Sequence, residues 1–296
     1  MPLLDEYLAR IRAMDPNLVI QFARLITVGA HNNAVIVTGL DSNWVFRFAK
    51  NDSGKSALSR EISVLDSIKD RTTVNVPVPV IRESDAIVYR MLEGEPLTYW
   101  TIAAANKVVQ QRMADQLGGF LRELHNTPKG LPIPDNTHED KGRMFAQIYD
   151  QVRSDLYPFM EAHQRDWVDR LFADADGIYD NLPPEQRSKL IYNDFKIGHV
   201  LYDPVAQKIS GILDFGIACY DAPDIDICNL MQCFGESFVT RMCRAYPEAR
   251  LMLPRARFGV WVMELAATLE GINEKNPNKL CFNIGIPRDI RFPILQ

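Results

Sequence analysis

The N-terminal part of the chain alternates short apolar runs with turn-forming residues. Residues 22–28, 34–39 and 44–48 are rich in β-branched and aromatic side chains, and Gly-Ala-His-Asn-Asn and Leu-Asp-Ser-Asn segments separate them. This pattern is typical of β-strands joined by turns. Residues 86–91 predict a further strand. Between these runs, apolar residues recur at helical spacing and predict one amphipathic helix over residues 56–69: Leu58, Ile62, Leu65 and Ile68.

The pattern becomes helical after residues 92–96, Leu-Glu-Gly-Glu-Pro, which we interpret as a hinge. Apolar residues line one face of a helix that ends near His125: Val109, Met113, Leu117, Leu121 and Leu124. Further helices are predicted over residues 144–159, 167–182, 225–234 and 257–269, and short strands over residues 191–192, 200–202 and 209–213. The order of elements predicts an α+β protein with two lobes, residues 1–92 and 93–296.

Composition and charge narrow the class of protein. The chain has 296 residues, of which 47% are hydrophobic and 24% charged, as in ordinary soluble proteins. Its formal net charge of −5 provides no field that would attract a nucleic-acid polymer. Residues 1–15 mix charged residues with leucines and predict an amphipathic helix, which fits neither a signal peptide nor a membrane span. We therefore expect no nucleic-acid polymer and no membrane as partners.

The cysteines give no sign of a disulfide framework or a zinc site. They are odd in number and lack Cys-x-x-Cys spacing: Cys219, Cys228, Cys233, Cys243 and Cys281. We expect reduced, mostly packed thiols in a cytoplasmic protein. The oligomeric state is left open by the sequence, and we favour a monomer.

The most informative segment is IYNDFKIGHVLYDPVAQKISGILDFG, residues 191–216. Asp194 lies in a loop after an apolar run, His199 follows five residues later, and Asp214 opens an Asp-Phe-Gly turn. An Asp-Phe-Gly turn alone is weak evidence, since Asp and Gly are ordinary turn residues. The ordered set suits phosphoryl transfer, in which one carboxylate orients the attacking hydroxyl and other ligands hold Mg²⁺. We expect Asp194 and Asp214 to project from one β-hairpin.

A sheet lobe, a hinge and a helical lobe that carries these aspartates form the layout of a protein-kinase-like fold. The nucleotide would lie between the lobes. In YNDFKIGHVL, SGILDFG and DAPDID the chain resembles the aminoglycoside phosphotransferase family, which includes the macrolide phosphotransferases, over about residues 29–269. The resemblance implies ATP or GTP as phosphoryl donor, Asp194 as catalytic base, His199 and Asp214 as Mg²⁺ ligands, and Asp226 as a brace of the catalytic loop.

The resemblance extends to the small lobe. In WVFRFAK the position of the family's phosphate-binding lysine falls on Arg47, with Glu61 of SREISVL as its helix partner. Side chains alternate along a strand, so Arg47 and Lys50 point to opposite faces, and Lys50 suits a solvated position near the strand's end. The layout further implies a phosphate-covering turn with Gly29, backbone contacts from Arg90 and Leu92 to the purine, and Tyr89 at the back of the pocket.

The chain departs from the family in three places. Arg47 replaces a lysine, Tyr192 replaces a histidine that supports the loop backbone, and the turn over residues 28–33 is poor in glycine. A guanidinium and an ammonium group both neutralise phosphate oxygens, and a tyrosine hydroxyl also forms hydrogen bonds. We expect activity to survive these exchanges. A catalytically weak, pseudokinase-like nucleotide-binding module is the alternative that they favour.

The acceptor is the least constrained part of the sequence. Family members place acidic and aromatic residues around a sugar amine, and the candidates here are Asp221, Asp224, Glu236, Trp261, Glu264 and Glu270. Gly-Glu-Pro-Leu-Thr and Leu-Asp-Phe-Gly resemble aminoglycoside 2″-type kinases, whereas Gly-His-Val-Leu and Phe-Gly-Glu resemble macrolide kinases. We expect a small amino-sugar-bearing acceptor of the aminoglycoside type. A macrolide, or a small metabolite such as choline, homoserine or a fructosamine, stays open.

Overall fold

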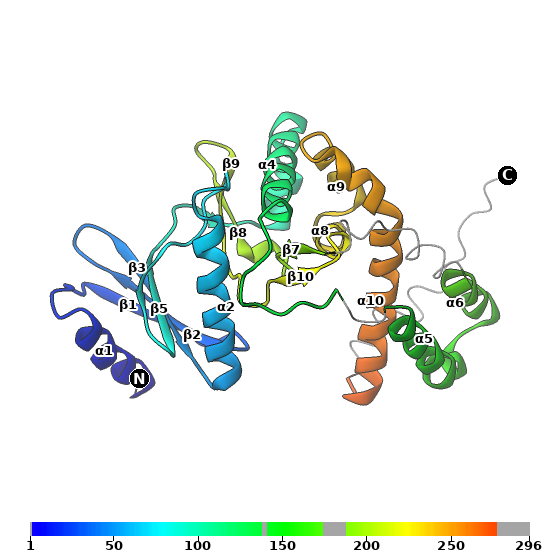
Figure 1. Cartoon of the computed structure of the whole chain (residues 1–296), viewed down its shortest axis with the longest axis horizontal. Helices are drawn as coiled ribbons and strands as arrows, with labels where there is room; N and C mark the ends of the chain where they lie inside the picture. Colours follow the sequence, from blue (N-terminus) through cyan, green and yellow to red (C-terminus); the bar gives the residue numbers. More distant parts are fainter. Residues whose placement is uncertain (1, 138–140, 174–187, 277–296) are drawn as a thin grey trace.

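The computed structural model describes residues 2–137, 141–173 and 188–276. One end of the elongated molecule holds a sheet with the helices α1 (Pro2–Met14) and α2 (Asp52–Ile68), and the other end is helical (Figure 1). Both sequence and structure thus give an α+β protein. The division into lobes at residue 92 stays a prediction, since one hydrophobic core joins the end of α2 to the helices beyond it.

The N-terminal sheet has five antiparallel strands in the order β1-β2-β3-β5-β4. Its strands are β1 (Phe22–Ile26), β2 (Asn32–Thr38), β3 (Asn43–Ala49), β4 (Pro79–Arg82) and β5 (Ala86–Arg90). Four of them fall where the sequence predicted strands. No strand was predicted over β4, because its first residue, Pro79, lacks a backbone hydrogen-bond donor.

Alternation along the strands gives the sheet two buried faces. One face carries valine and phenylalanine side chains that pack against Ile11 of α1, and the other carries Ile87 and Tyr89, which pack against Leu58 of α2. Arg47 lies on β3 between Phe46 and Phe48, whose side chains belong to the α1 face. Its side chain therefore points to the α2 face, which borders the cleft.

The helix α2 begins earlier than its apolar pattern indicates. Asn51 is the N-cap, and its side chain accepts a hydrogen bond of 2.9 Å from the backbone N–H of Gly54. Such a cap satisfies one of the unpaired donors of a first helical turn. The first turn is polar, so periodicity alone places the start of the helix at residue 56.

Two small sheets lie between the N-terminal sheet and the helices. The first pairs β6 (Glu95–Pro96), β8 (Val200–Asp203) and β9 (Lys208–Ile212) in the order β6-β8-β9, and the second pairs β7 (Lys189–Ile191) with β10 (Cys219–Asp221). The strand before Asp194 is therefore paired with β10. The expectation that Asp194 and Asp214 project from one β-hairpin is wrong: Asp214 follows the β8–β9 hairpin, and Asp194 follows β7.

The helical part is built around α4, α8 and α10 (Figure 1). Its helices are α3 (Tyr99–Ala104), α4 (Lys107–His125), α5 (Lys141–Gln151), α6 (Ala162–Ala173), α8 (Asp224–Phe234), α9 (Glu236–Met242) and α10 (Leu253–Asn273). Residues 144–159 were predicted as one helix. In the structure α5 ends at Gln151, and a π-helical turn (Val152–Leu156) and a 3₁₀ turn (Tyr157–Phe159) follow it. The short helices α3 and α9 were not predicted, and residues 174–182 lie outside the described residues.

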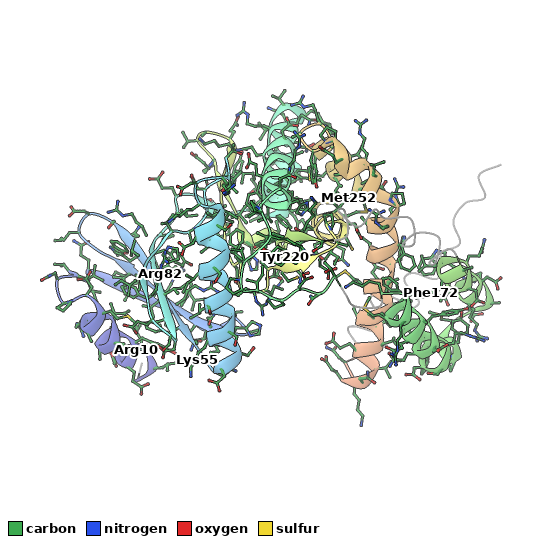
Figure 2. All side chains as sticks on the ribbon, in the orientation of Figure 1. Arg10, Lys55, Arg82, Phe172, Tyr220 and Met252 are labelled. Carbon is green, nitrogen blue, oxygen red and sulfur yellow. The ribbon has the colours of Figure 1, made fainter. Side chains whose placement is uncertain are left out.

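Two hydrophobic clusters organise these helices. The larger one includes Met252, and a second one, where α5 and α6 pack against α10, includes Phe172; both residues are labelled in Figure 2. The cysteines of the described ranges, Cys219, Cys228, Cys233 and Cys243, are free, as expected. Cys281 lies outside those ranges. None of the helices in the described parts of the chain combines the length and the apolar character that a bilayer crossing requires.

Candidate active site

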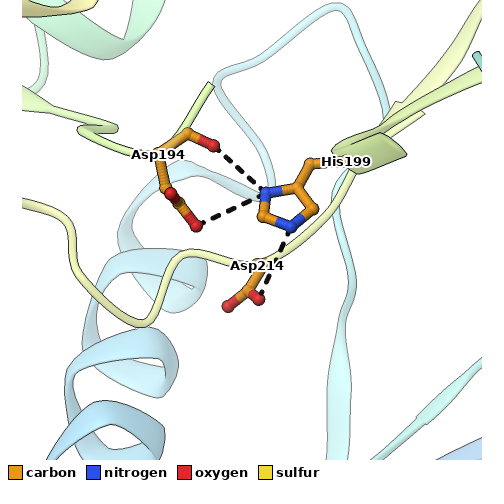
Figure 3. Close-up of side chains that lie close together, drawn as sticks. All are labelled: Asp194, His199 and Asp214. Atoms are coloured by element: carbon orange, nitrogen blue, oxygen red, sulfur yellow. Dashed lines mark hydrogen bonds and ion pairs between the residues drawn. The ribbon is translucent and has the colours of Figure 1, made fainter. Parts of the chain in front are cut away.

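Asp194, His199 and Asp214 lie together, although three different elements carry them. Asp194 follows β7, His199 ends a 3₁₀ turn (Ile197–His199) before β8, and Asp214 follows β9. His199 Nδ1 lies 3.1 Å from the Asp194 carbonyl oxygen and 3.5 Å from Asp194 Oδ2, and His199 Nε2 lies 3.9 Å from Asp214 Oδ2 (Figure 3). The sequence therefore predicted the residues that meet here, even though the predicted hairpin was wrong.

This trio has the donor set of a divalent-cation site. One ligand atom from each residue lies within 4.8 Å of the others, and all three side chains are half-buried. Carboxylate oxygens are the ligands that Mg²⁺ prefers, and imidazole nitrogen is a ligand of several other divalent ions. The residues present thus fit a divalent cation bound between the ring of His199 and the Asp214 carboxylate.

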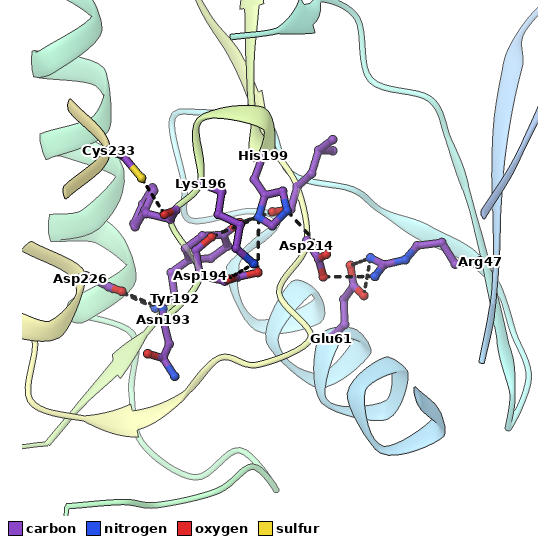
Figure 4. A network of polar contacts seen from close by, with 12 residues as sticks. Arg47, Glu61, Tyr192, Asn193, Asp194, Lys196, His199, Asp214, Asp226 and Cys233 are labelled. Carbon is purple, nitrogen blue, oxygen red and sulfur yellow. Dashed lines mark hydrogen bonds and ion pairs between the residues drawn. The ribbon is translucent and has the colours of Figure 1, made fainter. Parts of the chain in front are cut away.

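A buried carboxylate holds the loop that carries Asp194. Asp226 is fully buried in α8, and its two carboxylate oxygens accept hydrogen bonds of 2.8 and 2.7 Å from the backbone N–H groups of Tyr192 and Asn193 (Figure 4). His125 Nε2 lies 3.0 Å from Asp226 Oδ2. Asn193 has φ 64°, in the left-handed region where short polar side chains are tolerated. The contacts match the bracing role that the family resemblance implies for Asp226.

Arg47 joins the N-terminal sheet to the trio. Its Nη1 lies 2.7 Å from the carboxylate of the fully buried Glu61, and its Nη2 lies 3.1 Å from Asp214 Oδ1 (Figure 4). Burial raises the pKa of Glu61 to about 7 against the attraction of Arg47. The pKa of Arg47 is raised because Glu61 and Asp214 outweigh the cost of its burial. The predicted pair of Arg47 and Glu61 is thus present, and Asp214 extends it.

Asp214 is ionised in a strained and partly buried position. Its φ is 63°, which is unusual for a residue other than glycine. Burial opposes its charge, but Arg47 and His199 outweigh burial and lower its pKa. A carboxylate kept charged in this way suits a cation ligand, because it needs no deprotonation when the cation binds.

The trio opens into a cleft of about 800 Å³ between the sheet and the helical part. The β1–β2 turn with Gly29 lines one wall, Tyr89, Met91 and Leu92 line another, and Asp194, His199 and Asp214 lie at the base. Arg90 is not among the lining residues, and its guanidinium lies 5.6 Å from the ring centre of Trp44. Its proposed backbone contact to a purine stays a prediction.

Sequence reasoning missed two residues that belong to this site. Lys196 lines the cleft, and its Nζ lies 2.7 Å from Asp194 Oδ1. Its position two residues after Asp194 was the available signal. Met91 lines the cleft at the hinge. Lys50 is exposed, as expected, and its Nζ contacts the carbonyl oxygens of Thr27 (2.9 Å) and Gly29, which ties down the turn over the cleft.

The six acceptor candidates do not gather in this cleft, whose lining contains none of them among the described residues. Three of them form ion pairs with basic side chains: Asp221 with Lys141, Asp224 with Arg255, and Glu236 with Arg257. Trp261 packs edge-on against Trp167 at 5.1 Å between ring centres. Glu264 is half-buried and Glu270 exposed, both on α10.

Comparison with known proteins assigns the class. A model described as the phosphotransferase enzyme family matches residues 23–258, most of the chain. The chain therefore belongs to this family of small-molecule kinases, and the predicted kinase-like α+β fold is confirmed. No curated protein sequence matches it.

Solved structures of named phosphotransferases share the fold. The GDP and kanamycin complex of APH(2")-IIia is 23% identical, with a TM-score of 0.77 over 94% of this chain and 96% of that chain. Macrolide 2'-phosphotransferase type I is 20% identical, with a TM-score of 0.68 over 94% and 95%. MphH of Brachybacterium faecium is 17% identical, with a TM-score of 0.71 over 97% and 100%.

Proposed function

We propose that this protein transfers the γ-phosphoryl group of ATP or GTP to a hydroxyl of a small amino-sugar-bearing compound of the aminoglycoside antibiotic type. One observation carries the proposal: Asp194, His199 and Asp214 meet within 4.8 Å at the base of a cleft that Arg47 and the β1–β2 turn also line. Two structures of similar fold support it: one is a GDP and kanamycin complex, and the other is a macrolide 2'-phosphotransferase.

In the proposed reaction Asp194 orients the acceptor hydroxyl and takes its proton. The hydroxyl oxygen forms a bond to the γ-phosphorus while the bond to the nucleoside diphosphate breaks, so the diphosphate leaves with the bonding electrons. Arg47 and Lys196 line the cleft and supply fixed positive charge beside the phosphate oxygens. Mg²⁺, which His199 and Asp214 would hold, supplies further neutralisation of the triphosphate charge when it is bound.

The nucleotide site of the proposal lies against the hinge. Gly29 and its neighbours in the β1–β2 turn would cover the phosphates, Leu92 would meet the purine edge, and Tyr89 would close the back of the pocket. Glu61 would act through Arg47, which it holds at 2.7 Å. A cytoplasmic, monomeric protein is part of the same proposal.

The test is a coupled phosphorylation assay with ATP and with GTP over aminoglycosides, macrolides and small metabolites. We expect transfer to at least one aminoglycoside, and Asp194→Asn should abolish it while nucleotide binding is kept. Asp41→Asn, a change at an exposed carboxylate, is the control. Nucleotide binding without transfer to any acceptor would favour the pseudokinase-like module instead, and transfer only to choline, homoserine or a fructosamine would favour a metabolic kinase.

A macrolide acceptor is the second candidate, and the ion pairs of Asp221, Asp224 and Glu236 favour it. Carboxylates that already face a lysine or an arginine attract a polycationic acceptor less than free ones would. Binding of each acceptor should be measured at low and high ionic strength. A polycation should lose affinity steeply with added salt, whereas a large apolar macrolide should not.

A further inference from the structure

Tyr192 lies beside the two residues that would hold the cation, His199 and Asp214. Its side chain is fully buried, and its ring packs against Phe195 at 4.5 Å and Phe215 at 5.0 Å between ring centres. A phenol hydroxyl in such surroundings needs hydrogen-bond partners, because an unpaired buried polar group costs free energy. The partners of this hydroxyl decide what the residue does.

The Tyr192 hydroxyl reaches both sides of the cation site. It donates to the backbone carbonyl of Leu213, the residue before Asp214, and it lies 3.2 Å from His199 Nδ1. Leu213 in turn donates its own N–H to the His199 carbonyl at 2.9 Å. One side chain therefore connects the imidazole ring to the backbone that places the Asp214 carboxylate.

These contacts select one tautomer of His199. A tyrosine hydroxyl has a single proton, and a carbonyl only accepts, so the proton lies toward Leu213. The hydroxyl oxygen then faces His199 Nδ1 as an acceptor. The Asp194 carbonyl, 3.1 Å from the same nitrogen, also only accepts. Both neighbours thus require a proton on Nδ1, which leaves the lone pair of the neutral ring on Nε2.

We propose that Tyr192 is a positioning residue for the cation site. It holds His199 with the Nε2 lone pair turned toward Asp214 Oδ2, 3.9 Å away. Through the Leu213 carbonyl it also fixes the position of the Asp214 backbone relative to the imidazole ring. The inference rests on the proposed function only in that it needs a divalent cation at this trio.

The direct test is Mn²⁺ binding to the full chain, measured by electron paramagnetic resonance with a non-hydrolysable ATP or GTP analogue present. Tyr192→Phe keeps the ring and removes the hydroxyl, and we expect about tenfold weaker Mn²⁺ binding, since loss of a residue that orients a metal ligand typically costs 10- to 100-fold. Tyr220→Phe is the matched control. It removes a buried hydroxyl that accepts from the Gly130 and Leu131 N–H groups, away from the cation site.

A double-mutant cycle separates positioning from general loosening. In the His199→Asn background only the contact to the Leu213 carbonyl is left to lose, so Tyr192→Phe should weaken Mn²⁺ binding by a smaller factor than it does in the wild-type background. Equal losses in both backgrounds would overturn the inference, and so would unchanged affinity in Tyr192→Phe alone. If wild-type protein binds Mn²⁺ and nucleotide but transfers no phosphoryl group, the proposed function fails and the inference stands.

A second measurement needs no variant of Tyr192. The ¹⁵N shifts of His199 in the cation-free protein report which ring nitrogen is protonated, with His199→Asn used for assignment. We expect a protonated Nδ1 and an unprotonated Nε2 in the neutral ring. The opposite tautomer would overturn the inference even if Tyr192→Phe failed to fold.

Discussion

Arg47 contacts Glu61 and Asp214 at the same time, with Nη1 2.7 Å from the Glu61 carboxylate and Nη2 3.1 Å from Asp214 Oδ1. The planar fork of a guanidinium makes this possible, because its nitrogens point in fixed and different directions. A lysine ammonium concentrates its charge at one atom. The Arg47 guanidinium therefore links the helix α2 to Asp214 through a single side chain.

Arg47→Met should destabilise the protein by about 3–5 kcal/mol, because it leaves Glu61 fully buried without its partner. Since burial already raises the pKa of Glu61 to about 7, the variant should lose less free energy of unfolding at pH 6 than at pH 8. Chemical denaturation at both pH values measures this. Arg244→Met, which breaks an exposed pair with Asp115, is the control and should cost less than about 1 kcal/mol.

Lys196→Gln should lower kcat about tenfold while the nucleotide Kd changes little. The variant removes a positive charge 2.7 Å from Asp194 Oδ1, where charge develops on the transferred phosphoryl group. Lys196 is 65% exposed, so water replaces part of its effect. Steady-state kinetics and nucleotide titration measure the two quantities. Lys208→Gln, an exposed change on β9, should leave both unaltered; a similar loss there would contradict a local role for Lys196.

Gly94→Ala should destabilise the hinge by about 1–3 kcal/mol. Gly94 has φ 112°, and an added Cβ would lie 2.2 Å from Ser210 Oγ and 3.0 Å from the Tyr202 carbonyl oxygen. Gly119→Ala is the opposite case, since a Cβ there meets nothing within 4 Å and lies inside α4. That control should gain about 0.5–1 kcal/mol. Equal thermal shifts in the two variants would contradict the argument.

Asp85→Asn should lower the free energy of unfolding by about 0.5–1 kcal/mol at pH 7. The hydrogen bond from Arg10 lowers the pKa of Asp85, with burial acting against it. A depressed folded pKa stabilises the protein above the unfolded pKa of about 3.9, and this contribution is lost as the pH falls through the folded value. Wild type and variant should therefore converge in acid. Glu6→Gln, on the helix that carries Arg10, should show no such pH-dependent difference.

Local patterns predicted most of the elements and the composition of the site. Asp194, His199 and Asp214 were found from spacing and residue chemistry, and Arg47 from strand alternation together with the family resemblance. The prediction that Asp194 and Asp214 project from one β-hairpin was wrong because β7 pairs with β10, a strand distant in sequence. No local signal selects this partner. The same limit hid the ion pairs of Asp221, Asp224 and Glu236, whose partners come from α5 and α10.

The lengths of helices and the polarity of their turns explain the other differences between the predicted and the observed elements. The helices α3 and α9 have only 6 and 7 residues, too few to establish a period. The helix α2 starts at a polar turn whose Asn51 cap, and not its apolar spacing, marks the boundary. The predicted helix over residues 144–159 passes through a π-helical turn, which shifts the phase of the residues after it.

Asp226 has a consequence for the entropy of ligand binding. Its two oxygens already hold the Tyr192 and Asn193 N–H groups, and His125 lies against one of them, so folding itself orders the backbone that leads into Asp194. In the proposed reaction, Asp194 then does not need to be organised afresh at each catalytic cycle. The binding energy of nucleotide and acceptor is then free to bring the reactants together.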